Sequence, residues 1–125
     1  MLRNGIDIIE IERVRFLADL HIKRGSRFFT LYEISYCQSK GKQNYASFAG
    51  IFAAKEAFVK ALGIGFRWGT WTDIEVRHDE WGAPYIHAGG AYGARLKELG
   101  AKQVHLSISH SRLYAVAEVI LEGCI

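Results

Sequence analysis

Two carboxylates and a lysine are the side chains in this 125-residue sequence best suited to chemistry. Asp7 interrupts an apolar segment, and Glu56 and Lys60 lie four residues apart in a second one. Two carboxylates, with water and a substrate phosphate, form a ligand set that suits Mg²⁺, and a nearby lysine neutralises phosphate charge. An exposed aspartate on a strand and a surface Glu56–Lys60 ion pair on a helix explain the same pattern. Both interpretations stay open at this point.

Polar side chains also alternate with apolar ones near the end of the chain, in residues 104–109. His105, Ser107 and Ser109 share one face of the strand that this alternation predicts. An imidazole and two hydroxyls can hydrogen-bond a phosphate or a hydroxyl group. A solvated polar face on an edge strand has the same pattern and is the simpler interpretation of this segment alone.

The elements that must position these side chains are predicted from periodicity and capping signals. Strands are expected at 6–11, 70–77, 84–87, 104–109 and 114–121; helices are expected from 12 and from 30, and at 47–62 and 90–99. The longest helix runs from a cap at Ser47 to a stop at Gly63, and Thr30 with Glu33 forms a capping-box pattern. Lys55 falls within the apolar stripe of that helix, and we expect its stem to extend to the surface.

This order of elements, β-α-α-α-β-β-α-β-β, lacks the regular alternation of parallel crossovers. We therefore predict one α+β domain over residues 1–125, with a mainly antiparallel sheet packed around a long central helix. The net charge of +3 weakly favours acidic or phosphorylated partners. No apolar run is long enough to span a membrane, and two cysteines without a CxxC pair indicate a reducing compartment. We expect a cytoplasmic protein with no nucleic-acid or membrane partner.

Four segments together resemble one known family. They are GIDIIEIERV (5–14), FAGIFAAKEAFVKALG (48–63), DIEVRHDEWGAPYI (73–86) and VHLSISHSRLYAVAEV (104–119). In this order they resemble the holo-acyl-carrier-protein synthases, which are small phosphopantetheinyl transferases, and the resemblance covers nearly the whole chain. It implies transfer of 4'-phosphopantetheine from coenzyme A to a serine of apo acyl carrier protein, with Mg²⁺, releasing adenosine 3',5'-bisphosphate. Fatty acid biosynthesis, and so lipid metabolism, is the implied setting, although a polyketide carrier is an open alternative.

The resemblance also assigns roles to residues. Asp7 and Glu56 match the magnesium ligands and, with Lys60, make up the catalytic set. The coenzyme-binding candidates are Lys42, Lys60, Gly63, Pro84, His105 and Ser107. Arg13 matches a basic residue that grips the acidic recognition helix of the carrier protein, and Arg24 and Arg27 are further candidates for that contact. Many members carry an arginine where this chain has Ile51, which cannot contact phosphate, so the resemblance does not carry over that coenzyme contact.

Two consequences of the resemblance concern assembly and activity. Small members act as homotrimers, so part of the coenzyme pocket is expected from a neighbouring subunit. Loss of the arginine at position 51 leaves one alternative function, a non-catalytic module that binds coenzyme A or the carrier protein. A metal-dependent phosphoesterase that only cleaves coenzyme A is a second alternative. The Asp7–Glu56–Lys60 set argues against the first and Arg13 against the second.

Overall fold

The computed structural model of the chain describes residues 1–24, 27–66 and 69–125, without the side chains of residues 21–24. Its strands are β1 (Leu2–Glu10), β2 (Ile74–His78), β3 (Pro84–Ala88), β4 (Gln103–His110) and β5 (Tyr114–Glu122). Its helices are α1 (Ile11–Arg24), α2 (Leu31–Gln38), α3 (Asn44–Leu62) and α4 (Gly90–Leu99). Two short 3-10 turns occupy Gly41–Gln43 and Trp71–Asp73. Within these ranges, no helix is both long and apolar enough to cross a bilayer.

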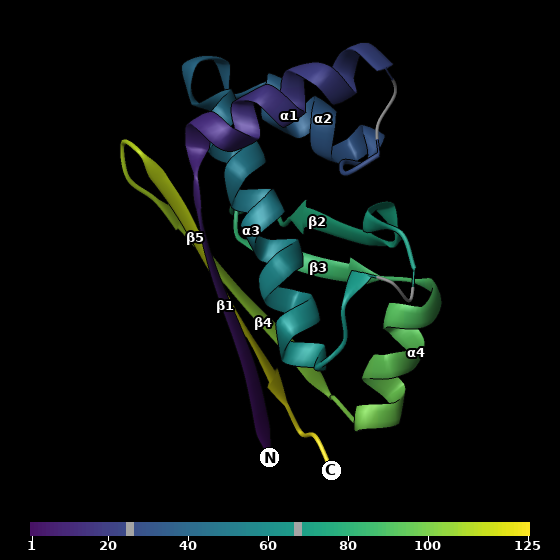
Figure 1. Cartoon of the computed structure of the whole chain (residues 1–125). Coiled ribbons are helices and arrows are strands. Elements are labelled where there is room, and N and C mark those ends of the chain that lie inside the picture. The colour runs from purple at the N-terminus through teal and green to yellow at the C-terminus, as the bar shows by residue number, and fades with distance from the viewer. Residues whose placement is uncertain (25–26, 67–68) are drawn as a thin grey trace.

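The strands form two antiparallel sheets on different sides of the central helix. One sheet has the order β1-β5-β4, and β2 pairs with β3 in a separate hairpin. Helix α3 packs against all three strands of the larger sheet, with α1 and α2 at one end and α4 near the other (Figure 1). The predicted α+β fold with an antiparallel sheet around a long helix is therefore confirmed.

Helix α3 is the core element of the chain. Its alanine-rich sequence favours a helix, and thirteen of its nineteen residues are buried. The predicted end is confirmed, because Gly63 has a φ of 74° and its N–H donates to the Lys60 carbonyl oxygen at 3.1 Å. The predicted start at Ser47 is wrong. The turn Gly41–Gln43 runs directly into the helix, which begins at Asn44.

The boundaries of two strands also differ from the prediction. The expected strand at 70–77 begins only at Ile74, because Thr70 and Asp73 form a capping box around a 3-10 turn. Strand β1 begins at Leu2 rather than at residue 6, since its first residues pair with the end of β5. The two ends of the chain meet there, and Cys124 N–H donates to the Met1 carbonyl oxygen at 3.1 Å.

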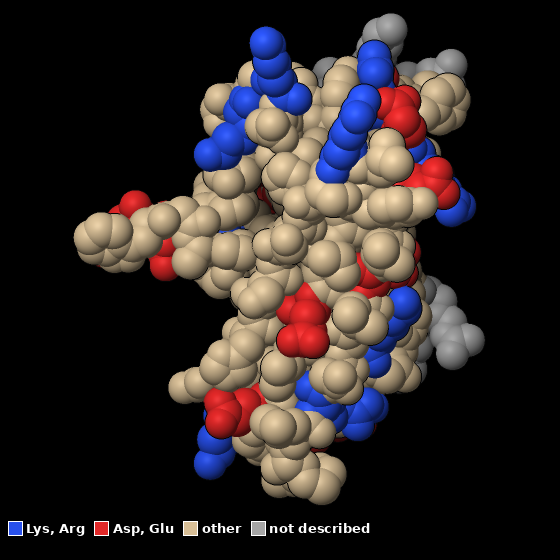
Figure 2. All heavy atoms as spheres, turned by 90° about the vertical axis from the view of Figure 1, so that its left-hand side faces the viewer, with Lys and Arg blue, Asp and Glu red and all other residues tan. Residues whose placement is uncertain are grey.

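The larger sheet presents an apolar face on the side opposite α3. Ile6 and Ile8 are 57% and 64% exposed, and Leu2 and Tyr114 are also exposed. Few charged side chains interrupt the middle of this face, whereas lysines and arginines are most numerous over the end with α1 and α2 (Figure 2). Asp7 lies on the inner face, opposite Ile6 and Ile8, as its place in the alternation predicted. An aspartate directed at solvent, the alternative interpretation, is wrong.

Candidate active site

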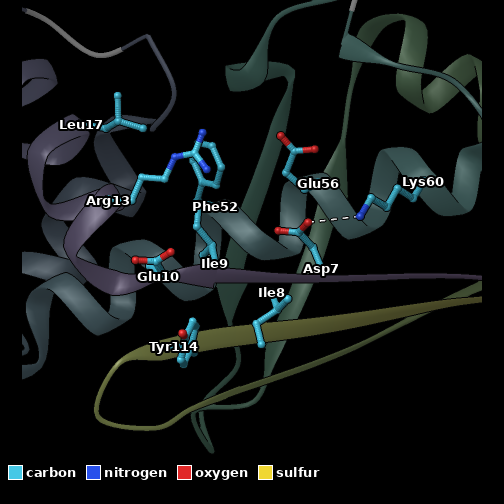
Figure 3. A pocket seen from close by; sticks show the side chains of 10 residues that line it. All are labelled: Asp7, Ile8, Ile9, Glu10, Arg13, Leu17, Phe52, Glu56, Lys60 and Tyr114. Carbon is cyan, nitrogen blue, oxygen red and sulfur yellow. Dashed lines mark hydrogen bonds and ion pairs between the residues drawn. The ribbon is translucent and has the colours of Figure 1, made fainter.

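A cavity of about 520 Å³ opens where β1, α1 and α3 meet. Asp7, Glu56 and Lys60 lie at one end of it, and Ile9, Leu17 and Phe52 line the other (Figure 3). Asp7 precedes Glu56 by 49 positions and Lys60 by 53, and the packing of β1 on α3 brings the three residues together. The structure thus places the whole predicted catalytic set in one cavity.

Lys60 links helix α3 to strand β1. Its Nζ donates to the Asp7 carboxylate at 3.2 Å and to the Ile6 carbonyl oxygen at 3.0 Å. The partner of Lys60 is therefore Asp7, and no Glu56–Lys60 ion pair is found among the described residues. The lysine side chain remains half exposed, so its charge is available to an anionic ligand in the cavity.

Glu56 faces the same space without a hydrogen-bond partner among the described residues (Figure 3). Partial burial raises the pKa of its carboxyl, and the nearby negative charge of Asp7 raises it further, while Lys60 opposes both. Two carboxylates that repel each other across a half-buried cavity form a donor set that a divalent cation would stabilise.

The donor set fits Mg²⁺ better than a metal that needs a complete protein cage. The described residues contain no group of three acidic, histidine or cysteine side chains able to hold a metal ion. Asp7 and Glu56 therefore offer two carboxylate ligands. Mg²⁺ commonly binds through one or two carboxylates and fills its remaining positions with water and substrate phosphate.

Arg13 reaches the same cavity from the first turns of α1. Its guanidinium extends over the cavity near Phe52, and the residue is exposed (Figure 3). Arg27 is also exposed, but it does not line this cavity. The side chain of Arg24 lies outside the described residues. Of the three arginines predicted to meet the carrier protein, Arg13 lines the same cavity as Asp7, Glu56 and Lys60.

The other predicted coenzyme residues lie apart from this cavity. His105 and Ser107 are on the outer face of the sheet, where His105 Nε2 is 2.9 Å from the Glu122 carboxylate. Lys42 lines a second cavity of about 470 Å³, together with His110 and Arg112. Gly63 caps α3, and Pro84 begins β3. In a single chain these residues do not share one pocket with Asp7.

The expectation for Lys55 is wrong. Its side chain is 0% exposed, and its Nζ donates to the Glu33 carboxylate at 2.7 Å and to the Phe28 and Trp71 carbonyl oxygens at 2.8 and 3.1 Å. All three ammonium donors are satisfied, so the stem has no need to reach water. Burial lowers the pKa of Lys55 and raises that of Glu33, while their mutual attraction opposes both changes.

Sequence reasoning recognised Glu33 only as part of a helix cap. The capping box is confirmed, since Thr30 N–H donates to Glu33 at 2.8 Å and Glu33 N–H donates to the Thr30 hydroxyl at 3.2 Å. The same carboxylate also accepts from Val76 N–H at 2.7 Å. A lysine in the middle of an apolar helix stripe was the signal that a buried acidic partner exists.

Comparisons with known proteins agree with this geometry. A model of the 4'-phosphopantetheinyl transferase superfamily matches residues 3–118. A holo-[acyl-carrier-protein] synthase of Halothermothrix orenii is 48% identical over 122 residues, covering 94% of each chain. The chain belongs to the holo-acyl-carrier-protein synthase family. It is thus a phosphopantetheinyl transferase, as its sequence motifs implied.

Solved members of the holo-acyl-carrier-protein synthase family share the fold. The chain superposes on the enzyme of Bacillus anthracis, solved with coenzyme A (3',5'-ADP), with a TM-score of 0.76 and 38% identity over 95% of this chain and 94% of that one. The Helicobacter pylori enzyme, solved with coenzyme A, gives a TM-score of 0.80 and 30% identity over 95% of this chain and 99% of that one.

Proposed function

We propose that this chain transfers 4'-phosphopantetheine from coenzyme A to a serine hydroxyl of an apo acyl carrier protein, with Mg²⁺, and releases adenosine 3',5'-bisphosphate. The observation that carries the proposal is the convergence of Asp7, Glu56 and Lys60 in one cavity of a chain from this family. Phosphoryl transfer needs positioned reactants and neutralised charge more than covalent help from the protein. These three side chains meet that need.

Each side chain has a distinct part in this mechanism. Asp7 and Glu56 would hold Mg²⁺, which supplies charge neutralisation at the pyrophosphate when bound. The half-exposed ammonium of Lys60 attracts the coenzyme phosphates and stays oriented by Asp7 and the Ile6 carbonyl. The serine proton leaves either to Glu56 or to water, and the geometry leaves both acceptors open.

The carrier protein is proposed to dock beside Arg13. This residue is exposed at the cavity, and the basic end of the molecule adjoins it (Figure 2). An arginine pairs bidentately with a carboxylate and so suits an acidic recognition helix. Arg24 and Arg27 remain predictions for the same contact. Charge complementarity of this kind increases encounter and fixes orientation.

The homotrimer that the family resemblance implies is proposed here too, and its support is that His105 and Ser107 face away from the cavity of their own chain. They can contact a coenzyme only if a second copy presents its cavity to this face. The apolar side chains of Ile6 and Ile8 on the same face give such a contact a hydrophobic centre. Light scattering should report a mass three times that of the chain.

The free thiols of Cys37 and Cys124 accord with the predicted cytoplasmic location.

Mass spectrometry of an apo carrier protein mixed with coenzyme A and Mg²⁺ tests the reaction. A gain equal to one phosphopantetheinyl group supports transfer. A non-covalent complex alone would indicate a binding module, an alternative that Ile51 favours because this buried residue cannot contact phosphate. Cleavage of coenzyme A without modification of the carrier would indicate a phosphoesterase.

We predict that Asp7→Ala and Glu56→Ala each abolish transfer while the circular dichroism spectrum stays that of the wild type. Removal of one of two protein ligands from an oxygen site should leave it empty at millimolar Mg²⁺ or below. Glu98→Ala is the matched control, since its carboxylate is 66% exposed and lies on α4, outside the cavity. Near-normal turnover of either site variant at low Mg²⁺ would contradict the assignment.

A further inference from the structure

Strand β1 touches the backbone of helix α3 at Gly5. A Cβ atom at this position would overlap the carbonyl oxygen of Ala57, and it would lie 2.8 Å from the Ala61 nitrogen and 3.0 Å from the Lys60 Cβ. The first two atoms belong to a hydrogen-bonded helix and cannot rotate away. Any larger residue at position 5 must therefore move the strand away from the helix.

Such a movement would reach Asp7 directly. Gly5 and Asp7 are two residues apart, so both face α3, and Gly5 is buried there. The atoms that Gly5 touches belong to the helical turn between Glu56 and Lys60 and to the residue that follows it. Gly5 therefore lies at the point where the strand that carries Asp7 is held against the helix that carries Glu56.

The spacing of the two carboxylates matters because Mg²⁺ has little geometric tolerance. Its ligand oxygens lie at about 2.0–2.1 Å, and it prefers near-ideal octahedral geometry. Lys60 already depends on close contact, since its Nζ reaches both Asp7 and the Ile6 carbonyl oxygen of β1. A strand displaced far enough to admit a methyl group would separate the carboxylates by a substantial part of one metal–ligand distance.

We propose that Gly5 is a positioning residue that sets the separation of Asp7 and Glu56, so that one divalent cation contacts both. The inference rests on the metal site of the proposed function. Gly5 does not touch substrate or metal, and it acts through the contact of its backbone with Ala57 and Ala61.

Gly50 provides a matched control on the same helix. A Cβ atom at Gly50 would meet only Ile108 Cγ2, at 2.7 Å, which is a side-chain methyl of β4 and not backbone of β1. Both glycines are buried between α3 and the larger sheet, but Gly50 meets β4, which β5 separates from the strand that carries Asp7. Gly50→Ala therefore introduces the same methyl group without widening the Asp7–Glu56 separation.

The experiment measures Mn²⁺ binding by electron paramagnetic resonance, in the presence of coenzyme A, for the wild-type chain, Gly5→Ala and Gly50→Ala. Residues that orient metal ligands typically change metal affinity by about 10–100-fold, so we expect Gly5→Ala to weaken Mn²⁺ binding at least about tenfold. The Mn²⁺ affinity of Gly50→Ala should stay within about twofold of the wild-type value, because the metal ligands Asp7 and Glu56 do not move. Wild-type affinity in Gly5→Ala would overturn the inference.

Compensation by a longer side chain separates a spacing role from general damage. Asp7→Glu adds one methylene, so it should weaken Mn²⁺ binding in the wild-type background but improve it in Gly5→Ala. Failure to improve it would overturn the inference. If Gly5→Ala does not fold, the exchange Asp7→Glu with Glu56→Asp gives the decision. This double variant keeps the summed length of the two carboxylate side chains, so it should bind Mn²⁺ better than either single variant. If its Mn²⁺ affinity is no better than that of the single variants, a fixed spacing of the two carboxylates is overturned.

The outcomes separate this inference from the proposed function. A wild-type chain that does not bind Mn²⁺ would overturn the metal site and the inference together. Transfer activity and metal binding in the wild type, with no effect of Gly5→Ala, would overturn only the role of Gly5.

Discussion

Replacement of Lys55 by methionine should destabilise this fold more than any comparable change at a surface lysine. The side chain is fully buried and donates to the Glu33 carboxylate and to two backbone carbonyl oxygens. Methionine keeps the apolar stem but leaves Glu33 buried beside a thioether that cannot donate a hydrogen bond. Removal of one partner from a buried ion pair typically costs about 3–5 kcal/mol, because the remaining charge is uncompensated.

Lys60→Met is the matched control on the same helix. Its ammonium also pairs with a carboxylate, that of Asp7, but the lysine side chain is 53% exposed. Water screens such a pair, so the expected loss is only about 0–1 kcal/mol. Urea unfolding should be compared at one protein concentration, since the stability of an assembling chain depends on the concentration of its subunits.

A second variant identifies the cause of the loss at Lys55. Glu33→Gln removes the carboxylate charge that Lys55→Met leaves unpaired. It keeps an oxygen that can accept from Val76 N–H, which lies 2.7 Å from the present carboxylate. The double variant Lys55→Met with Glu33→Gln should therefore be more stable than Lys55→Met alone. If Lys55→Met loses no more than Lys60→Met, or if the double variant recovers nothing, the uncompensated charge is not the cause.

Two further predictions concern the carrier protein and pH. Arg13→Glu should strongly raise the KM for carrier protein and change coenzyme A affinity little. The difference in carrier KM between variant and wild type should shrink with added salt, because screening weakens both the wild-type attraction and the mutant repulsion. An unchanged carrier KM would exclude this role of Arg13. Burial and the charge of Lys40 lower the pKa of His78 from its ordinary value of 6.5. The unfolded chain therefore binds more protons than the folded chain between that pH and the lowered pKa of the folded chain, so folding stability falls on acidification through this range. In urea unfolding between pH 7.5 and 5.5, His78→Asn should lose less stability than wild type, and an equal loss would show that His78 does not contribute.

Local signals in the sequence predicted those element boundaries that depend on one residue and the adjacent turn. Gly63 ends α3 as expected, because a left-handed glycine depends only on its own residue and the preceding turn. The start at Asn44 was missed, since Ser47 has the residue type of a helix cap but lies inside the helix. Residues 70–73 likewise combine strand-forming side chains with a capping box that overrides them.

The candidate site was predictable in its residues but not in its contacts. Asp7 and Glu56 stood out as polar residues within apolar segments, and the family motifs gave them a common role. The structure adds that Lys60 pairs with Asp7 rather than Glu56, which depends on how β1 packs on α3. Glu33 was missed as the partner of Lys55, because a contact between residues twenty-two positions apart has no local signal.

The contact of Gly5 with Ala57 and Ala61 has a consequence for how the site responds to change elsewhere. Glycine and alanine have no side-chain rotamers, so this contact carries no conformational freedom that could absorb a displacement. Most core contacts can relax by rotation of longer side chains, so the distance between the packed elements changes as neighbouring residues are substituted. Here the spacing is set by backbone atoms, so the separation of strand and helix should stay constant while much of the surrounding core diverges.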